Sequence, residues 1–243
     1  MDHHHHHHHH EHHHHDAGKE HSDFAGANEA YFDAGAEKND VQPEWVKLAH
    51  DAVEAILKAY PESFDKDKTQ VLDFACGTGL VSRELFPHVN SILGIDISQA
   101  SVDVYNRHVT EQGISPEKLK AVKTLLKGED GELDGNKYDV VVCTAAYHHF
   151  DDVNDITRIL ASFIKPGGSL VITDTMPEAS IGSAPEMYER VAHVVPHQHG
   201  FTEEQTRAIF EKAGLKDVDY RFGADASYEG RKLTFFIARA IKK

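Results

Sequence analysis

The sequence is poor in cysteine and in basic residues for a chain of 243 residues. Its two cysteines, Cys76 and Cys143, both lie at the ends of apolar, strand-like runs, which excludes a disulfide framework and favours a cytoplasmic protein. Lysine and arginine total 25 against 40 acidic residues, so the formal net charge is −15. Nucleic acids and anionic membranes attract cationic surfaces, so we expect neither as a partner of so acidic a chain. A small molecule is the expected ligand.

Long apolar runs are also lacking. None approaches the roughly 20 residues that a helix needs to cross a bilayer, and the polar N-terminal segment has no apolar core of the signal-peptide kind. Hydrophobic residues nevertheless make up 40% of the chain, which suits one α/β domain with a sizeable core. The sequence leaves open whether the protein is a monomer or a homodimer.

Histidine is in clear excess, and most of it lies at the start of the chain. Residues 3–10 and 12–15 are all histidine, separated only by Glu11. The tract is either a purification tag or a native low-complexity sequence. In both cases we expect residues 1–23 to be disordered and to chelate Ni²⁺ or Zn²⁺ loosely, since histidines on a flexible chain impose no fixed geometry.

Short apolar runs alternate with helical patterns along the rest of the chain. Residues 70–74 form a buried, partly β-branched run, which small residues at 76–79 and an apolar helical repeat at 80–86 follow. Further strands are predicted over residues 91–96, 119–126, 138–143 and 169–174, further helices over 43–60, 98–113, 151–164 and 202–214, and loops over 128–136 and 165–168. Such alternation is typical of a parallel, doubly wound sheet with helices on both faces.

Three segments depart from that alternation. Residues 215–222 and 232–240 are two β runs with no helix between them, so we predict a closing hairpin. Residues 24–42 are expected to form a short helix or an N-terminal lid, and 178–199 an insert that is irregular and partly helical. We find no internal repeat and expect a single domain over residues 24–243.

The junction of the first strand, the glycine loop and the following helix is the strongest candidate for a ligand site. Bare backbone amides at such a helix N-terminus approach nucleotide-type ligands. The loop has Gly77 and Gly79 but lacks the third glycine of a dinucleotide fingerprint. Asp73 ends the strand, where a carboxylate repels a pyrophosphate and suits a cationic amino group. Asp96, at the tip of the second strand, suits the hydroxyls of an adenosine ribose, since Ser98 already caps the next helix.

Five landmarks follow one another in the order found in a known family. The sequence Val-Leu-Asp-Phe-Ala-Cys-Gly-Thr-Gly at 71–79 resembles the first motif of class I S-adenosylmethionine-dependent methyltransferases. Gly-Ile-Asp-Ile-Ser at 94–98 resembles their acidic second-strand motif, and 138–143, 147–150 and 160–168 resemble the later landmarks. The resemblance is closest to the small-molecule branch related to ubiquinone and menaquinone biosynthesis enzymes, and the chain also resembles uncharacterised fungal members.

This resemblance implies a Rossmann-like, doubly wound sheet of seven strands whose last strand is antiparallel. It also implies S-adenosylmethionine as the cofactor. Gly77 and Gly79 would approach the methionine part of that cofactor, Asp73 would lie near its amino group, and Asp96 would hold its ribose.

The same resemblance implies further cofactor contacts. An acidic side chain after the third strand, Glu129 or Asp130, is expected at the adenine. Thr144 and Ala145 are expected beside the methyl group. Apart from the resemblance, the aromatic side chains of Tyr31 and Phe32 in the N-terminal segment are expected to close over the cofactor. The full set of expected cofactor-binding residues is Asp73, Ala75, Cys76, Gly77, Thr78, Gly79, Asp96, Ile97, Glu129, Asp130, Thr144, Ala145 and Tyr31.

Catalysis places few demands on such a protein, because the sulfonium of the cofactor is already a strong electrophile. The protein mainly has to align an acceptor atom with the S–CH₃ bond, and a general base helps only where the acceptor carries a proton. The candidate catalytic residues are Tyr147, His148 and His149, although capping or packing is the commoner role for such histidines. His197 and His199 are expected in a structural loop, and no metal site is expected, since cysteine and carboxylate ligands at suitable spacing are missing.

The resulting hypothesis is an S-adenosylmethionine-dependent methyltransferase that transfers a methyl group to a small-molecule acceptor by in-line displacement. The alternative is a catalytically silent regulator that binds the same cofactor and chelates metal with its histidine tail. A dinucleotide-dependent oxidoreductase is a third and weaker reading. The sequence names neither the acceptor nor the methylated atom, whose determinants are expected in 147–149 and 178–199.

Overall fold

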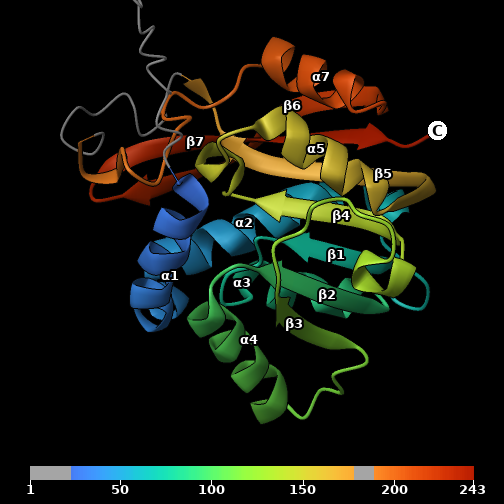
Figure 1. Ribbon diagram of the computed structural model, residues 1–243, viewed down its shortest axis with the longest axis horizontal. Coiled ribbons are helices and arrows are strands. Elements are labelled where there is room, and N and C mark those ends of the chain that lie inside the picture. The colour runs from blue at the N-terminus through green and yellow to red at the C-terminus, as the bar shows by residue number, and fades with distance from the viewer. Residues whose placement is uncertain (1–22, 178–188) are drawn as a thin grey trace, which may run out of the picture.

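A seven-stranded sheet lies between layers of helices in the computed structural model, which describes residues 23–177 and 189–243 (Figure 1). The strands are β1 (Gln70–Phe74), β2 (Ser91–Asp96), β3 (Leu119–Lys123), β4 (Tyr138–Thr144), β5 (Ile164–Thr175), β6 (Lys216–Tyr228) and β7 (Arg231–Ile241). The α-helices with described bounds are α1 (Phe24–Val41), α2 (Pro43–Ala59), α3 (Leu80–Leu85), α4 (Gln99–Glu111), α5 (Val153–Ser162) and α7 (Glu203–Lys212).

The strand order is β3-β2-β1-β4-β5-β7-β6. Strands β1 to β5 are parallel, and β7 runs antiparallel to both of its neighbours, β5 and β6. The doubly wound sheet and its antiparallel last strand are therefore confirmed. The order reverses between β1 and β4, and in open sheets of this kind ligands bind beyond the carboxyl ends of the strands at that point.

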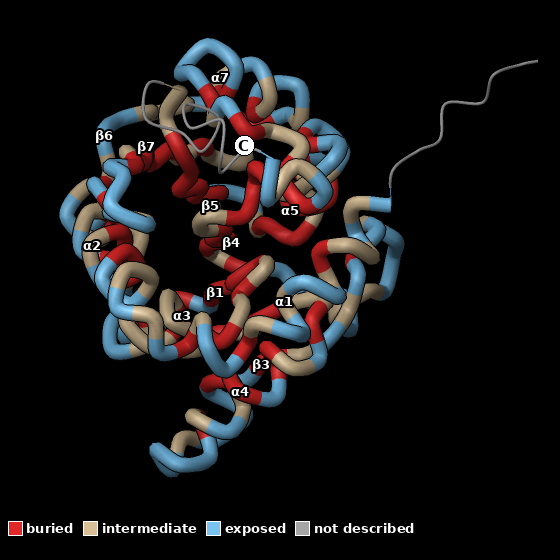
Figure 2. Tube along the Cα trace, turned by 90° about the vertical axis from the view of Figure 1, so that its left-hand side faces the viewer, coloured by how far each residue is buried: buried red, intermediate tan, exposed pale blue. Residues whose placement is uncertain are grey.

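Two apolar cores flank the central strands. Leu72 and Val141 face a core that α5 and α7 cover, whereas Val71 and Val140 face a core that α2, α3 and α4 cover. All four side chains are at most 2% exposed. Burial on both faces explains why these strands appear in the sequence as continuous apolar runs rather than alternating ones. In Figure 2 the buried part of the trace follows the strands, and the exposed part lies on the outer helices.

The prediction of a loop at 165–168 is wrong, because these residues are part of a strand. Those residues belong to β5, where Tyr138 pairs with Ile164 and Val140 pairs with Ser169. The ladder therefore shifts register, and the Pro-Gly-Gly stretch bulges out of it without ending the strand.

The predicted closing hairpin is confirmed, although β6 is longer than expected and reaches Tyr228. The turn is made by Glu229 and Gly230, whose φ angles of 49° and 75° match the left-handed positions of a two-residue hairpin loop. Residues 178–188 of the predicted insert and 1–22 of the predicted tail lie outside the described residues. Within the described part of the chain, no helix is both long and apolar enough to cross a membrane.

Helix α1, expected as a short helix or lid, is a helix of 18 residues beside the carboxyl ends of the parallel strands (Figure 1). Its attachment is mainly polar, since the buried residues of α1 are Asn28, Ala36 and Asp40. Several charged or polar contacts join α1 to the rest of the protein, and the Asp40 carboxylate makes two of them. This carboxylate accepts a hydrogen bond from Arg83 at 2.7 Å and lies 2.7 Å from Nε2 of His108.

The Asp40 carboxylate is ionised in this setting. Burial alone would raise its pKa, but the hydrogen bond and charge of His108 and the charge of Arg83 lower it below its ordinary value. A second pair on the same helix, Glu37 with Arg107, is bidentate at 2.7 and 2.8 Å but exposed to solvent. Buried and exposed pairs on one helix therefore offer a matched comparison.

Replacing Asp40 with alanine should loosen α1. The variant Asp40→Ala leaves Arg83 and His108 without their acceptor, at a cost of about 1–3 kcal/mol. Hydrogen exchange of the α1 amides should then be roughly tenfold faster or more, because local opening becomes easier. Glu37→Ala is the control and should have little effect, since exposed ion pairs contribute little. Equal loss of protection in both variants would contradict the role assigned to Asp40.

Candidate cofactor and acceptor site

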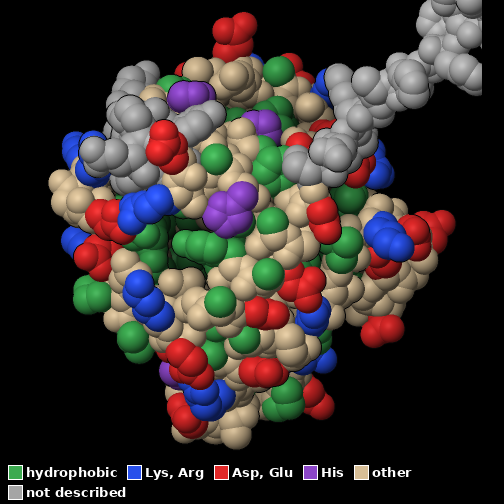
Figure 3. Space-filling model, turned by 60° about the vertical axis from the view of Figure 1, so that its left-hand side comes forward, with side chains coloured by type: hydrophobic (Ala, Val, Ile, Leu, Met, Phe, Trp, Pro, Cys, Tyr) green, Lys and Arg blue, Asp and Glu red, His purple; other side chains and the backbone are tan. Residues whose placement is uncertain are grey.

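Two adjoining cavities lie at the carboxyl ends of β1, β2 and β4, next to α1. The first, called here the aromatic cavity, has a volume of about 280 Å³ and is bordered by Trp45, Tyr228 and His148 among others. The second, called the Asp96 cavity, has a volume of about 430 Å³. Both are lined by Phe32, Ala75, Gly77, Ala145 and His149. Figure 3 shows a hollow on this side of the molecule with hydrophobic side chains inside and a histidine beside it.

The glycine loop occupies the junction between the cavities. Gly77 has φ 53°, and a Cβ built there would meet nothing within 4 Å, so the absence of a side chain leaves room in the cavity. Gly79 has a different reason to be glycine, because a Cβ there would lie 2.5 Å from the Tyr105 ring. Gly79 lines neither cavity. Ala75 and Ala145, which directly follow β1 and β4, also take left-handed φ angles, 57° and 53°.

Asp96 connects this loop to β2. Its Oδ2 accepts a hydrogen bond from the Gly77 amide at 2.8 Å, and its Oδ1 accepts one from the Ser98 amide at 2.9 Å. Burial raises the pKa of the carboxyl, although these hydrogen bonds oppose the shift. Ser98 caps α4 through Ser101, as predicted, which leaves Asp96 free of a capping role. Asp96 and Ile97 line the Asp96 cavity.

Asp73 lies at the other side of the loop, on the wall of the aromatic cavity. Only 2% of it is exposed, and its carboxylate accepts a hydrogen bond from the Ser82 hydroxyl at 2.6 Å. Burial raises the pKa of Asp73 to about 7. Of the other residues predicted at the cofactor, the aromatic cavity is lined by Cys76, Thr78, Thr144 and Tyr31.

Glu129 and Asp130 are not at the site, contrary to the prediction. Both are exposed and line neither cavity. The chain folds back before it reaches them, because the Glu132 carboxylate accepts hydrogen bonds from the backbone amides of residues 127–129. Thr124 and Leu125, directly after β3, line the Asp96 cavity instead. Sequence register alone could not locate this reversal.

Tyr147, a predicted catalytic candidate, also lies away from both cavities. It is 2% exposed, lines neither cavity, and its hydroxyl is 2.9 Å from Thr157 Oγ1 inside the core. Burial raises its pKa well above the ordinary value, so it keeps its proton. His197 and His199 likewise line neither cavity, and the His197 amide donates to the His148 carbonyl at 3.2 Å, which fits a loop role.

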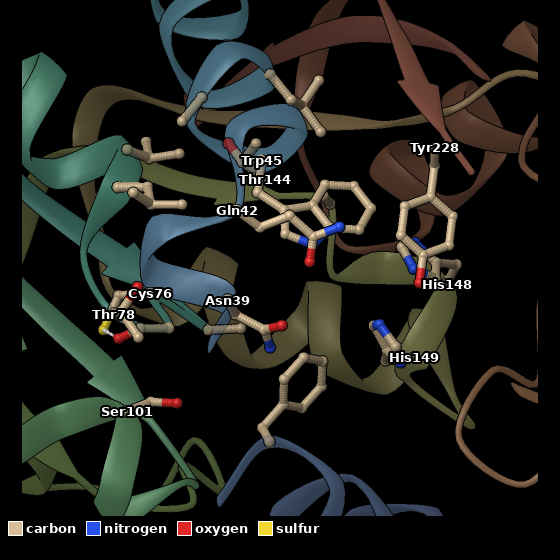
Figure 4. A pocket seen from close by; sticks show the side chains of 18 of the residues that line it. Asn39, Gln42, Trp45, Cys76, Thr78, Ser101, Thr144, His148, His149 and Tyr228 are labelled. Carbon is tan, nitrogen blue, oxygen red and sulfur yellow. Dashed lines mark hydrogen bonds between the residues drawn. The ribbon is translucent and has the colours of Figure 1, made fainter. Parts of the chain in front are cut away.

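His148 and His149 both reach the cavities, but their environments differ. Nδ1 of His148 lies 2.9 and 3.1 Å from the two carboxylate oxygens of Asp174. Nδ1 of His149 lies 2.8 Å from the carbonyl oxygen of Val194, and burial, followed by the proximity of His148, lowers the pKa of His149 to about 3. In Figure 4 the two histidines lie next to each other at one end of the aromatic cavity, near Tyr228.

Sequence reasoning missed Trp45, Tyr228 and Asp174. Trp45 lies on the helix predicted over 43–60, and its ring lines the aromatic cavity and stacks on Tyr228 at 4.8 Å between centroids. Asp174 lies one residue before the end of β5, much as Asp96 ends β2, so a carboxylate near the end of an apolar run was the available signal. Among the described residues, no group of three or more histidine, cysteine or acidic side chains could hold a metal ion.

Comparison with known proteins points to a family. A family model described as a methyltransferase domain matches residues 45–220. An uncharacterized methyltransferase of Schizosaccharomyces pombe is 36% identical over 158 residues, covering 63% of this chain and 56% of that protein. A ubiquinone biosynthesis O-methyltransferase of Coxiella burnetii is 29% identical over 115 residues, 47% of each protein. The chain thus spans about half the length of the curated relatives it matches.

Solved structures share the fold. Magnesium protoporphyrin IX methyltransferase of Synechocystis PCC 6803, solved with bound SAH, gives a TM-score of 0.64 at 18% identity and covers 90% of this chain and 99% of its own. At that identity the likeness shows the fold alone, which is the class I methyltransferase fold. Because the family model spans well over half of the sequence, the chain belongs to the class I S-adenosylmethionine-dependent methyltransferase family.

Proposed function

We propose that this protein transfers a methyl group from S-adenosylmethionine to a small molecule held in the aromatic cavity. The observation that carries the proposal is the junction of two cavities at Gly77, Ala75 and Ala145. A cofactor that crosses this junction has its adenosine on one side and its reactive methyl group facing the other. The chemistry supplied by the bound cofactor is an electrophilic methyl group, and the protein contributes alignment of the acceptor.

The residues present fit this cofactor. Asp96 offers a carboxylate to the ribose hydroxyls, and Ile97 with Leu125 offers apolar walls to the adenine. The open space over Gly77 fits the methionine part, whose ammonium group suits the buried carboxyl of Asp73. These roles are part of the proposal.

The aromatic cavity favours a small and largely apolar acceptor. Its deep walls include Leu48, Val194, Leu233 and Phe235, together with the Trp45 ring. A volume of about 280 Å³ suits a small molecule and leaves no room for a folded chain. The names of the relatives do not support the alternative of a silent regulator, since they are methyltransferases. Both cysteines are unpaired, which is compatible with the cytoplasm that we propose as the location.

The size of the acceptor can be tested directly. The purified protein is incubated with S-adenosylmethionine labelled in its methyl group and with a cell extract that a size filter divides into metabolites and macromolecules. The label should be transferred to an extractable compound in the metabolite fraction. Transfer confined to protein or nucleic acid would contradict a small-molecule acceptor.

Cofactor affinity should depend on Asp96 and not on Asp130. Asp96→Ala removes the acceptor of the ribose hydroxyls and of the Gly77 amide, so the Kd for S-adenosylmethionine should rise about ten- to a hundredfold, or about 1.4–3 kcal/mol. Asp130→Ala, a matched loss of one carboxylate outside both cavities, should leave the Kd unchanged. Isothermal titration calorimetry measures both. An unchanged Kd in Asp96→Ala would remove Asp96 from the site.

Cofactor affinity should also depend on pH through Asp73. The pKa of this group is about 7 without ligand, so the carboxyl is largely protonated below that pH. An ammonium group prefers the ionised carboxylate, and its binding therefore releases a proton. Affinity should rise with pH up to the pKa of Asp73, by at most about tenfold per pH unit, and flatten above it. Asp73→Asn should abolish this slope, and a slope that persists in that variant would assign it to another group.

A further inference from the structure

His148 and Asp174 form a buried pair at the wall of the aromatic cavity. Asp174 is 0% exposed, and among the described residues its hydrogen bonds come from His148 and Thr175. Backbone amides supply one bond to each carboxylate oxygen: the His148 amide donates to Oδ2 at 3.2 Å and the Thr175 amide donates to Oδ1 at 2.6 Å. The carboxylate plane is therefore fixed independently of the His148 ring.

This arrangement determines the state of the His148 ring. Burial alone would raise the pKa of Asp174, but the charge and hydrogen bond of His148 and the two backbone amides lower it below the ordinary value. An ionised carboxylate only accepts hydrogen bonds, so Nδ1 of His148 must carry the proton. In the neutral ring the lone pair then lies on Nε2, which has no hydrogen-bond partner among the described residues. The ring itself borders the aromatic cavity.

His148 is better placed to accept a proton from an acceptor than His149, Tyr147 or Asp73. His149 is a poor proton acceptor, because the pKa of about 3 means that its protonated form is unstable where it lies. Tyr147 is sealed in the core. Asp73 is the one carboxylate among the described residues that border the aromatic cavity, and we assign it to the cofactor. A neutral imidazole backed by a carboxylate is a suitable general base near neutral pH.

On the basis of the proposed function, we propose that Asp174 is a positioning residue that holds His148 as the general base for a hydroxyl acceptor, and that this acceptor is an apolar, phenol-type molecule. As the acceptor oxygen bonds to the methyl carbon, the C–S bond breaks and its electron pair stays on sulfur. The hydroxyl proton passes to Nε2 of His148. The products are the methyl ether, S-adenosylhomocysteine and an imidazolium that Asp174 stabilises until the proton is lost to water.

The cavity favours a hydroxyl over an amine for two reasons. A protonated amine would need a free carboxylate in the aromatic cavity, and Asp73 is already committed to the cofactor. A neutral amine has an available lone pair and gains nothing from a base, whereas a phenol with a pKa of about 10 must lose its proton at neutral pH. The stacked rings of Trp45 and Tyr228 complement a flat apolar ring.

The decisive variant is Asp174→Asn. In this variant one carboxylate oxygen becomes an NH₂ group, which cannot accept a hydrogen bond. Because each oxygen accepts a backbone amide and Nδ1 of His148 lies within 3.1 Å of both, the NH₂ group faces a backbone donor and Nδ1 in either orientation. That contact favours the other tautomer, with the proton on Nε2. We expect kcat to fall about 10²- to 10⁴-fold, with KM for both substrates within about threefold. Asp139→Asn, the same change near the start of the neighbouring strand β4 and outside both cavities, is the control.

The acceptor panel uses labelled S-adenosylmethionine with 4-ethylphenol, 2-naphthol, 4-nitrophenol and 4-ethylaniline. 4-Nitrophenol is already substantially ionised near neutral pH and needs a base least. Asp174→Asn and His148→Gln should therefore lose far more activity on 4-ethylphenol than on 4-nitrophenol, a difference that misfolding would not produce. Equal losses on the two phenols would overturn the role of the pair, and so would a lack of transfer to every hydroxyl compound.

The state of the ring is tested separately by ¹⁵N NMR of the wild-type protein bound to S-adenosylhomocysteine, which keeps the proposal falsifiable if Asp174→Asn does not fold. His148 should show a protonated Nδ1 and a free Nε2, and a proton on Nε2 at neutral pH would overturn the proposal. Transfer to 4-ethylaniline alone would overturn the hydroxyl assignment while supporting the proposed function. Transfer to macromolecules alone would instead contradict the proposed function itself.

Discussion

The hydrogen bond from the Gly77 amide to the Asp96 carboxylate is the contact on which the arrangement of both cavities depends. It joins the loop after β1 to the tip of β2, while the other oxygen of Asp96 accepts a hydrogen bond from the amide of Ser98, the N-cap residue of α4. The loop is thereby kept in a left-handed turn with empty space above Gly77. Because the cavities meet at this loop, the same bond sets the position of the cofactor and the direction from which an acceptor can approach.

Burial shifts the pKa values of the ionisable groups around this loop, and the local partners of each group decide the final direction of its shift. Among the described residues, Asp73 has one hydrogen-bond partner, the Ser82 hydroxyl, so burial prevails and its pKa rises to about 7. Burial and the neighbouring His148 suppress the charged form of His149, and the hydrogen bond to the Val194 carbonyl does not offset them. Asp174 has an imidazole and two backbone amides, which together outweigh burial. One apolar environment thus supplies groups suited to different tasks.

The sequence was sufficient to predict most of the strands and the closing hairpin, because apolar runs, capping residues and glycines are local signals. It also singled out Asp73, Gly77 and Asp96, which line the two cavities, since strand ends converge at one edge of a parallel sheet. It failed where the chain path depends on contacts between distant residues. Glu129 is turned away by a hydrogen-bonded loop, and Trp45 reaches the cavity because its partner lies on β6 near the end of the chain. Neither contact leaves a periodic signature.

The polar attachment of α1 has a consequence for the conditions under which the cavities stay covered. Phe32 of this helix borders both cavities, and the helix is held by the buried Asp40 carboxylate together with exposed ion pairs, such as Glu37 with Arg107, that each contribute little. Exposed ion pairs weaken as dissolved salt shortens the Debye length, from about 10 Å at 0.1 M to about 3 Å at 1 M, whereas buried pairs are screened much less and apolar cores are not screened. The covering of the site is therefore more sensitive to ionic strength than the sheet beneath it, although the Asp40 contacts limit the effect.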